Sequence, residues 1–96
     1  TLHIDEGACE AILLKGGSLL ACGLLEVDGE FEKAEVVEII NPSGKTIARG
    51  ISRFNKNELL LIKGKTNAEV LDEYPGKNRP EVVHRDHLAP LQTSLD

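Results

Sequence analysis

A tight turn between two apolar segments constrains this sequence more than any other feature. Asn41-Pro42-Ser43-Gly44 places Asn, Pro and Gly at the first, second and fourth positions of a type I turn. Residues 36–40 before it read Val-Val-Glu-Ile-Ile, which is typical of a strand with its Glu turned outward, and residues 45–54 supply a return strand. The pattern therefore predicts a β-hairpin. Gly50 interrupts the return strand and predicts either a bulge or a close approach of another backbone.

Short helices are expected on both sides of the hairpin. Asp5 can cap a helix whose apolar residues recur at helical spacing, and Gly16-Gly17 would end it. Two further helices are expected where a capping residue stands three positions before a Glu. These two pairs are Asn55 with Glu58 and Thr66 with Glu69.

Short strands complete the pattern. They are expected at residues 19–20 and 24–27, before a turn at Asp28-Gly29, and at 81–88, where a closing strand follows the polar loop 77–80. A chain of 96 residues forms one core, so residues 1–96 are expected to be a single domain. The predicted fold is mixed and mainly β: a small, strongly curved sheet closed as a barrel, with a few short helices.

The charge of the chain changes sign along its length. Residues 1–38 hold nine acids against two lysines, which gives −7; residues 39–65 hold six basic residues against one acid, which gives +5; and residues 66–96 sum to −3. A nucleic-acid interface needs clustered Lys and Arg to displace counterions from phosphates. Only the middle third of the chain supplies such a cluster, and a solvated mixed surface is the simpler interpretation.

The composition predicts a cytoplasmic protein. No stretch approaches the roughly 18 apolar residues of a membrane span, and no signal peptide is apparent, so no membrane contact is expected. Cys9 and Cys22 lie in apolar-patterned segments without a C-x-x-C spacing, so two buried, reduced thiols are expected. The sequence contains no Met, even at position 1, and we therefore expect a piece of a longer protein.

The letters His84-Arg85-Asp86 invite comparison with protein kinases. The kinase catalytic loop reads H-R-D-L-x-x-x-N, in which the Asp accepts a proton and the Asn holds magnesium. In this chain His87 follows Asp86, and Leu91 occupies the position of the required Asn. The glycine-rich loop, the strand lysine and the D-F-G aspartate are missing as well. The sequence therefore argues against a protein kinase.

Other chemical motifs are equally incomplete. Ser43-Gly44-Lys45-Thr46 resembles the end of a phosphate-binding P-loop, but Ile39 stands where that motif needs Gly, and a hairpin turn is the favoured interpretation. His84 and His87 would point to opposite faces of a strand, and His3 is the only other histidine. We therefore predict no catalytic residue and no metal ligand in this chain.

A series of short motifs gives the chain a specific resemblance. Their order resembles the C-terminal PUA domain of bacterial glutamate 5-kinases over nearly the whole chain. The matching segments are Thr1-Leu2-x-Ile4-Asp5-x-Gly7-Ala8, Gly17-Ser18-Leu19-Leu20, Gly29-Glu30-Phe31, Val36-Val37-Glu38-Ile39, Ile47-Ala48-Arg49-Gly50, Glu58-Leu59, Ile62-Lys63-Gly64 and Val83-His84-Arg85-Asp86-x-Leu88.

The resemblance implies a PUA pseudo-barrel fused behind an amino-acid-kinase domain. That kinase domain binds ATP, magnesium and glutamate and makes glutamyl 5-phosphate, the first step of proline synthesis. The chain contains none of it, so the resemblance implies a non-catalytic accessory or regulatory module. Its expected partner is the kinase domain of the same parent, which is expected to be a homo-oligomer. Two departures from the family pattern, Ala21 and Ala34-Glu35, lie in expected turns.

RNA binding is the main alternative function, beside a free-standing PUA-like adaptor. PUA domains of RNA-modifying enzymes hold RNA in a groove between the first helix, the strand after it and the closing strand. In this chain the first two of these elements carry the acids Asp5, Glu6, Glu10, Glu26 and Asp28. RNA binding through that groove is therefore expected to be weak or lost. If RNA does bind, the expected contacts are Arg49, Arg53, Lys63, Lys65 and Arg85.

Overall fold

A five-stranded sheet forms the centre of the molecule in the computed structural model, which describes residues 1–76 and 79–91. The strand order is β2-β1-β3-β4-β5, and the β1–β3 pair is parallel while the other neighbours are antiparallel. The strands are β1 (Leu2–Ile4), β2 (Leu24–Val27), β3 (Val36–Ile40), β4 (Thr46–Ile51) and β5 (Leu88–Pro90).

The two edges of this sheet are joined by backbone hydrogen bonds. Leu19 lies shortly before β2, and Val82 and Val83 lie shortly before β5. The N–H of Leu19 donates to the carbonyl of Val83 at 2.9 Å, and the N–H of Val82 donates to the carbonyl of Leu19 at 2.8 Å. These bonds curl the sheet into a partly closed barrel, which confirms the mixed, mainly β pseudo-barrel expected from the sequence.

The predicted hairpin is confirmed, although its second strand is shorter than expected. The N–H of Gly44 donates to the carbonyl of Asn41 at 2.9 Å and closes the turn. The bulge lies at Ile39/Ile40 and not at Gly50. A Cβ on Gly50 would lie 2.5 Å from Cγ1 of Val83, so this glycine permits the closing segment to cross β4.

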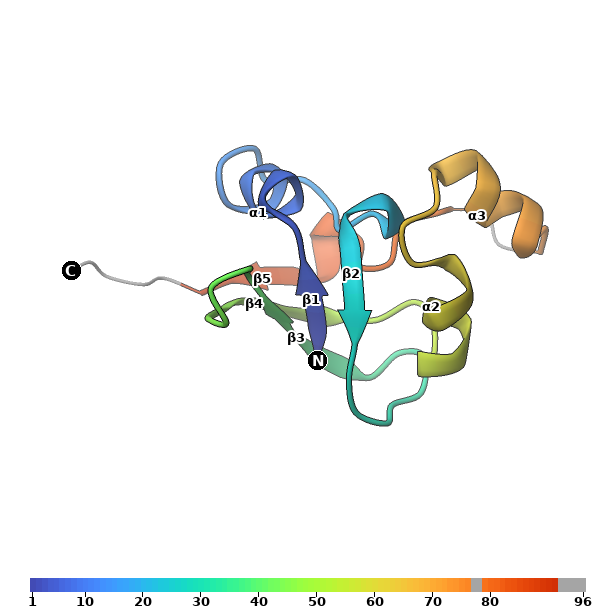
Figure 1. Ribbon diagram of the computed structural model, residues 1–96, viewed down its shortest axis with the longest axis horizontal. Helices are drawn as coiled ribbons and strands as arrows, with labels where there is room; N and C mark the ends of the chain where they lie inside the picture. Colours follow the sequence, from blue (N-terminus) through green and yellow to red (C-terminus); the bar gives the residue numbers. More distant parts are fainter. Residues whose placement is uncertain (77–78, 92–96) are drawn as a thin grey trace.

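Three short helices flank the sheet. They are α1 (Glu6–Leu13), α2 (Lys56–Ile62) and α3 (Asn67–Glu73). Asp5 caps α1 through its side chain, and both predicted capping boxes form at the starts of α2 and α3. Figure 1 shows α1 on one side of the β1–β2 pair and α2 and α3 on the other.

The closing segment differs from its prediction. Residues 81–88 were expected to form one strand, but Val83 makes only an isolated bridge to Leu19, and β5 begins at Leu88. Arg85–His87 forms a 3₁₀ turn, η2, which is closed by a hydrogen bond from the N–H of His87 to the carbonyl of His84 at 2.8 Å. The expected strand at 19–20 is likewise reduced to the same bridge. The expected loop at 77–80 lies partly outside the described residues.

Both departures from the family pattern occupy turns. Ala21 begins a 3₁₀ turn, η1 (Ala21–Gly23), and its carbonyl accepts a 2.7 Å hydrogen bond from the N–H of Gly64. Ala34 has a φ of 73°, in the left-handed region that favours glycine. The N–H of Ala34 donates to the carbonyl of Ser52 at 2.7 Å, so tertiary bonding holds this residue in a strained conformation.

A single aliphatic core fills the space between the sheet and the helices. Its largest side chain is Phe54, whose ring centroid lies 5.7 Å from that of Tyr74. Cys9 is buried as expected, but the prediction of a buried Cys22 was wrong because η1 turns its side chain outward. Within the described residues, no helix has the length and apolarity that a bilayer crossing requires.

Candidate functional site

An acidic region surrounds α1 and β2. It consists of Asp5, Glu6, Glu10, Glu26 and Asp28, and residues 1–29 contain Lys15 as their only Lys or Arg. Two of these acids have local partners. Oδ1 of Asp5 accepts the N–H of Ala8 at 2.8 Å, and Oδ2 of Asp28 lies 2.7 Å from Nε2 of His3. The other three carboxylates make no ion pair with any described residue, so the region presents net negative charge to solvent.

The pKa of the Cys9 thiol is affected by burial and by carboxylates of the same acidic region. Burial of this side chain raises the pKa of the thiol, and the charges of Glu6 and Asp5 raise it further. A thiol whose pKa is raised stays protonated near neutral pH and is a poor nucleophile. Cys9 is buried in the core, and its raised pKa disfavours the reactive thiolate form.

A hollow of about 220 Å³ lies between α1 and the chain that leads into β2. Small and apolar residues dominate its lining, with Asp5 as its only charged residue. The walls are close together, because a Cβ added to Gly23 would lie 2.6 Å from Cβ of Ala8. The described residues that line it are Asp5, Gly7, Ala8, Ala11, Ser18, Leu20, Cys22 and Gly23.

A second hollow, which we call the basic hollow, lies where the chain after β4 meets η2. Its volume is about 210 Å³, and four of its five lining side chains are Arg or His. The lining residues are Arg53, Arg79, His84, Asp86 and His87. The N–H of Arg53 donates to the carbonyl of Val82 at 2.9 Å, so the backbone anchors this arginine to the closing segment.

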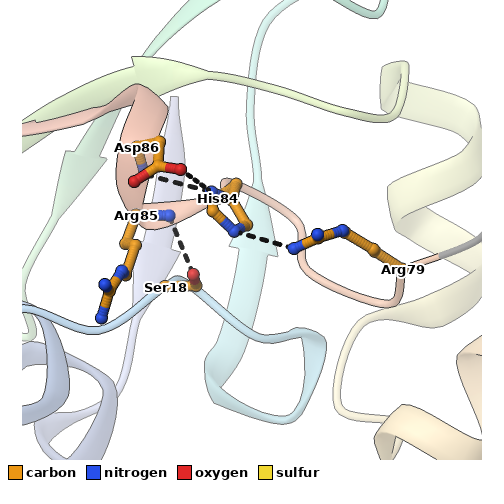
Figure 2. Close-up of polar contacts among 5 residues, drawn as sticks. All are labelled: Ser18, Arg79, His84, Arg85 and Asp86. Atoms are coloured by element: carbon orange, nitrogen blue, oxygen red, sulfur yellow. Dashed lines mark hydrogen bonds and ion pairs between the residues drawn. The ribbon is translucent and has the colours of Figure 1, made fainter.

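His84 organises the basic hollow, and Figure 2 shows its ring between Asp86 and Arg79. Nε2 of His84 lies 3.1 Å from Nη1 of Arg79, and Nδ1 lies 3.1 Å from the backbone nitrogen of Asp86 and 3.5 Å from Oδ2 of Asp86. A neutral imidazole accepts at only one nitrogen, whereas guanidinium and peptide N–H groups only donate. Nδ1 accepts the N–H of Asp86 at the start of η2, so the proton of the neutral ring lies on Nε2, the nitrogen that faces Nη1 of Arg79.

The structure corrects the expected orientation of the two histidines. On a strand, His84 and His87 would point to opposite faces, but their ring centroids lie 6.4 Å apart and both rings line the basic hollow. The reason is the 3₁₀ turn, in which residues three apart are eclipsed. Arg79 was not singled out by sequence reasoning, because nothing in its neighbours signals a fold-back onto His84.

The structure does not gather the five predicted RNA contacts into one patch. Arg53 lines the basic hollow. Arg49 on β4 is 3.3 Å from Glu38, and Lys65 is 3.8 Å from Glu73. Lys63 is exposed at the end of α2. The N–H of Arg85 donates to Oγ of Ser18 at 2.8 Å, and its side chain points away from His84 and Arg79 (Figure 2). RNA contact by these residues stays a prediction.

Nucleotide and metal ligands find no matching arrangement in the described residues. The segment Ser43-Gly44-Lys45-Thr46 belongs to the hairpin turn, where the N–H groups of Ser43 and Lys45 both donate to Oδ1 of Asn41 at 3.0 and 2.9 Å. These amides are therefore not directed at a phosphate, as they are in a P-loop. No group of three His, Cys, Asp or Glu side chains in residues 1–76 and 79–91 is placed to hold a metal ion.

Comparison with known proteins gives a consistent result. The family model named PUA domain matches residues 1–74. A glutamate 5-kinase of Desulfitobacterium hafniense (strain Y51) is 46% identical over 92% of this chain and 24% of its own length, and one of Vibrio campbellii (strain ATCC BAA-1116) is 40% identical over 93% of this chain and 24% of its own. The chain thus spans about a quarter of the length of these curated relatives.

Solved structures give the same fold. A conserved PUA domain protein from Thermoplasma acidophilum is 22% identical, covers 85% of this chain and 45% of its own, and has a TM-score of 0.59. A PUA domain from Aeropyrum pernix K1, solved as a tartrate complex, is 28% identical, covers 90% of this chain and 41% of its own, and has a TM-score of 0.62.

Proposed function

Because this chain belongs to the PUA domain family, we propose that it is the non-catalytic accessory domain of a glutamate 5-kinase, the ATP-dependent first enzyme of proline biosynthesis. The observation that carries the proposal is the identity of 40–46% with glutamate 5-kinases over about nine-tenths of the chain. The parent is a cytoplasmic homo-oligomer in this proposal, and catalysis belongs to its kinase domain. ATP and magnesium would be bound by that domain, because the described residues of this chain offer neither a P-loop nor a metal cluster.

Charge favours a protein partner over RNA at the acidic region. Phosphate groups approaching α1 and β2 meet five carboxylates, and only Lys15 among the Lys and Arg of residues 1–29 opposes them. The Coulomb term that supplies most non-specific RNA affinity is therefore unfavourable there. An RNA-binding module remains the second candidate, since it is a known role of PUA domains and since Arg53 and Arg85 lie near the closing segment.

The apolar end of α1 is the docking surface in this proposal, and the kinase domain of the parent is its occupant. Leu14 is 78% exposed and Leu13 is 45% exposed, so both expose apolar area that a partner would bury. They line a hollow of about 310 Å³ with Cys9, Glu10, Asn41 and Glu6. An exposed apolar pair beside a concavity, rimmed by polar residues, has the anatomy of an interface core.

Hydrogen exchange in the full-length kinase tests this docking. We expect the amides at the end of α1 to exchange more slowly in the full-length protein than in the isolated chain, because docking excludes water from Leu13 and Leu14. A Leu14→Ser variant of the full-length kinase should lose this protection. Leu61→Ser on α2 is the matched control, since Leu61 is also an exposed leucine at 57%. Equal exchange in the two proteins would contradict docking through α1.

An NMR titration of the labelled chain with tRNA tests the alternative. At about 150 mM salt we expect no persistent shifts, because exposed charges are screened beyond about 8 Å at that ionic strength. Saturable shifts that cluster on Lys15, Glu26 and Arg85 and survive this salt would mean that the groove binds RNA. That result would replace the accessory-domain proposal with the RNA-binding one.

A further inference from the structure

The basic hollow is lined mainly by basic side chains, although the chain as a whole is acidic. The net charge of the chain is −5. An adjoining hollow shares Arg53 and His87 with the basic hollow and adds Lys33. With both imidazoles neutral, the two hollows together hold three cationic side chains against one carboxylate, Asp86. Electrostatic potential at this point therefore favours an anion, although the protein as a whole repels one.

Arg79 has a poor partner in the basic hollow. Its Nη1 lies 3.1 Å from Nε2 of His84, which carries the proton of the neutral ring when Nδ1 accepts the N–H of Asp86. Among residues 1–76 and 79–91, no carboxylate lies within ion-pair distance of Arg79. Guanidinium groups bind oxyanions through two parallel hydrogen bonds, which are stronger than a single bond to an imidazole. An oxyanion entering the hollow would therefore be a better partner than the one that Arg79 has.

The neighbouring acids do not block the hollow. The side chain of Asp86 is 72% exposed, so solvent screens its charge. Glu81 is the next acid along the closing segment. It does not line the hollow, and its Oε1 is buried.

The size of the basic hollow limits how large a bound group can be. At about 210 Å³ it is smaller than the roughly 300–1,000 Å³ of sites that hold drug-sized ligands. We propose that the basic hollow is a binding site for the phosphate group of a small solute, with Arg79 and Arg53 as its cationic donors and His84 and His87 as additional N–H donors. This site is independent of docking through α1, because none of its residues belongs to α1.

Titration with inorganic phosphate at constant ionic strength tests the site. In NMR spectra of the labelled chain, we expect saturable shifts at residues 53, 79 and 84–87. Arg79→Gln should weaken phosphate binding about tenfold, because it removes a charge-assisted donor. Lys63→Gln is the matched control: it removes one exposed positive charge outside the hollow and should change the affinity less than about twofold.

Two results would overturn the site, and a third would call for a different variant. Phosphate-induced shifts that do not saturate would show only weak, non-specific association. Equal weakening by Arg79→Gln and Lys63→Gln would show a general effect of net charge. Loss of the native spectrum in Arg79→Gln would leave the affinity unmeasured for that variant, and His87→Gln then takes its place, with unchanged phosphate binding as the contradicting result.

A competition experiment distinguishes the source of the phosphate. Ribose 5-phosphate and a short single-stranded RNA are added to separate samples at the same phosphate concentration. A small-solute site predicts that ribose 5-phosphate saturates the same residues and that RNA binds no tighter per phosphate. Binding of RNA that is about tenfold tighter, with shifts spreading beyond the hollow, would assign the phosphate to nucleic acid and overturn the small-solute assignment.

Discussion

The hollow beside α1 and the basic hollow at η2 have nearly the same volume, about 220 and 210 Å³, yet the net charges of their linings are of opposite sign. The first is lined mainly by short side chains and by Asp5, the residue that caps α1. Long basic side chains from separate segments line the second. The comparison teaches that volume alone does not identify a ligand class, because the sign of the charge and the donor set decide which solute gains free energy by entering.

The two regions also differ in how the backbone shapes them. Beside α1, Gly23 packs against Ala8, and the N–H of Asp5 donates to the carbonyl of Gly23 at 3.0 Å, so helix and turn are fixed together. At η2, the shape depends on the closing segment crossing β4 at Gly50. The contacts of the first region join segments fewer than twenty residues apart, whereas the crossing at Gly50 joins segments more than thirty residues apart.

The largest predicted effect is a loss of folding stability caused by a substitution beside the basic hollow. Gly50→Ala places a Cβ 2.5 Å from Cγ1 of Val83 and 3.0 Å from the carbonyl oxygen of His87, so the closing segment must move. We expect the free energy of unfolding to fall by about 3 kcal/mol, the upper range for overpacking a tight site. Chemical denaturation measures it. Gly76→Ala, with no atom within 4 Å of the added Cβ, is the control and should change stability by less than about 0.5 kcal/mol.

The next prediction tests whether the negative charge of the acidic region prevents it from binding RNA. Glu10→Lys with Glu26→Lys raises the net charge of the acidic region by four, and Glu32→Lys with Asp72→Lys raises the net charge by four elsewhere. If local charge prevents RNA binding, the first pair should raise tRNA affinity about tenfold over the second at about 150 mM salt, or about 1.4 kcal/mol. Fluorescence anisotropy measures both. Equal gains in the two variants would show that net charge, and not the acidic region, controls binding.

A smaller effect is expected from strain beside the basic hollow. Ala34, which lines the adjoining hollow, has a φ of 73°. Ala34→Gly relieves the clash of Cβ in this conformation, although it also makes the unfolded chain more flexible. We expect a net stabilisation of about 0.5 kcal/mol, measured as an increase in the denaturation midpoint. Destabilisation would mean that the methyl group contributes more by packing than it costs in strain.

The smallest effect concerns Glu69, which lies outside both regions and serves as a reference. The hydrogen bond from the backbone N–H of Thr66 lowers the pKa of this carboxyl, the Thr66 hydroxyl lowers it further, and the charge of Lys65 contributes least. A lowered pKa stabilises the fold above the unfolded-state pKa, and this contribution is lost as the pH falls through the folded-state value. Denaturation of Glu69→Gln in the acid range should therefore show a slightly weaker dependence on pH. An unchanged slope of the free energy of unfolding against pH would show that the capping box does not contribute to the pH dependence in the acid range.

Sequence reasoning identified the parts of the fold that rest on local chemistry. The turn at residues 41–44, the Asp5 cap and both capping boxes were confirmed because each depends on residues within a few positions of one another. The strand expected at 81–88 was wrong because the competing 3₁₀ turn is closed by His84 and by its contact with Ser18, which is 67 residues from Arg85 in sequence.

The same distinction between local and long-range contacts applies to the candidate sites. The sequence alone determined the acidic character of α1 and β2, because five carboxylates within residues 1–29 carry their charge wherever those elements lie. Only the tertiary structure brought Arg53, Arg79, His84 and His87 to one hollow. Charge is a property of each residue, whereas convergence depends on how the closing segment crosses β4, and no local pattern specifies the partner of a segment so distant in the chain.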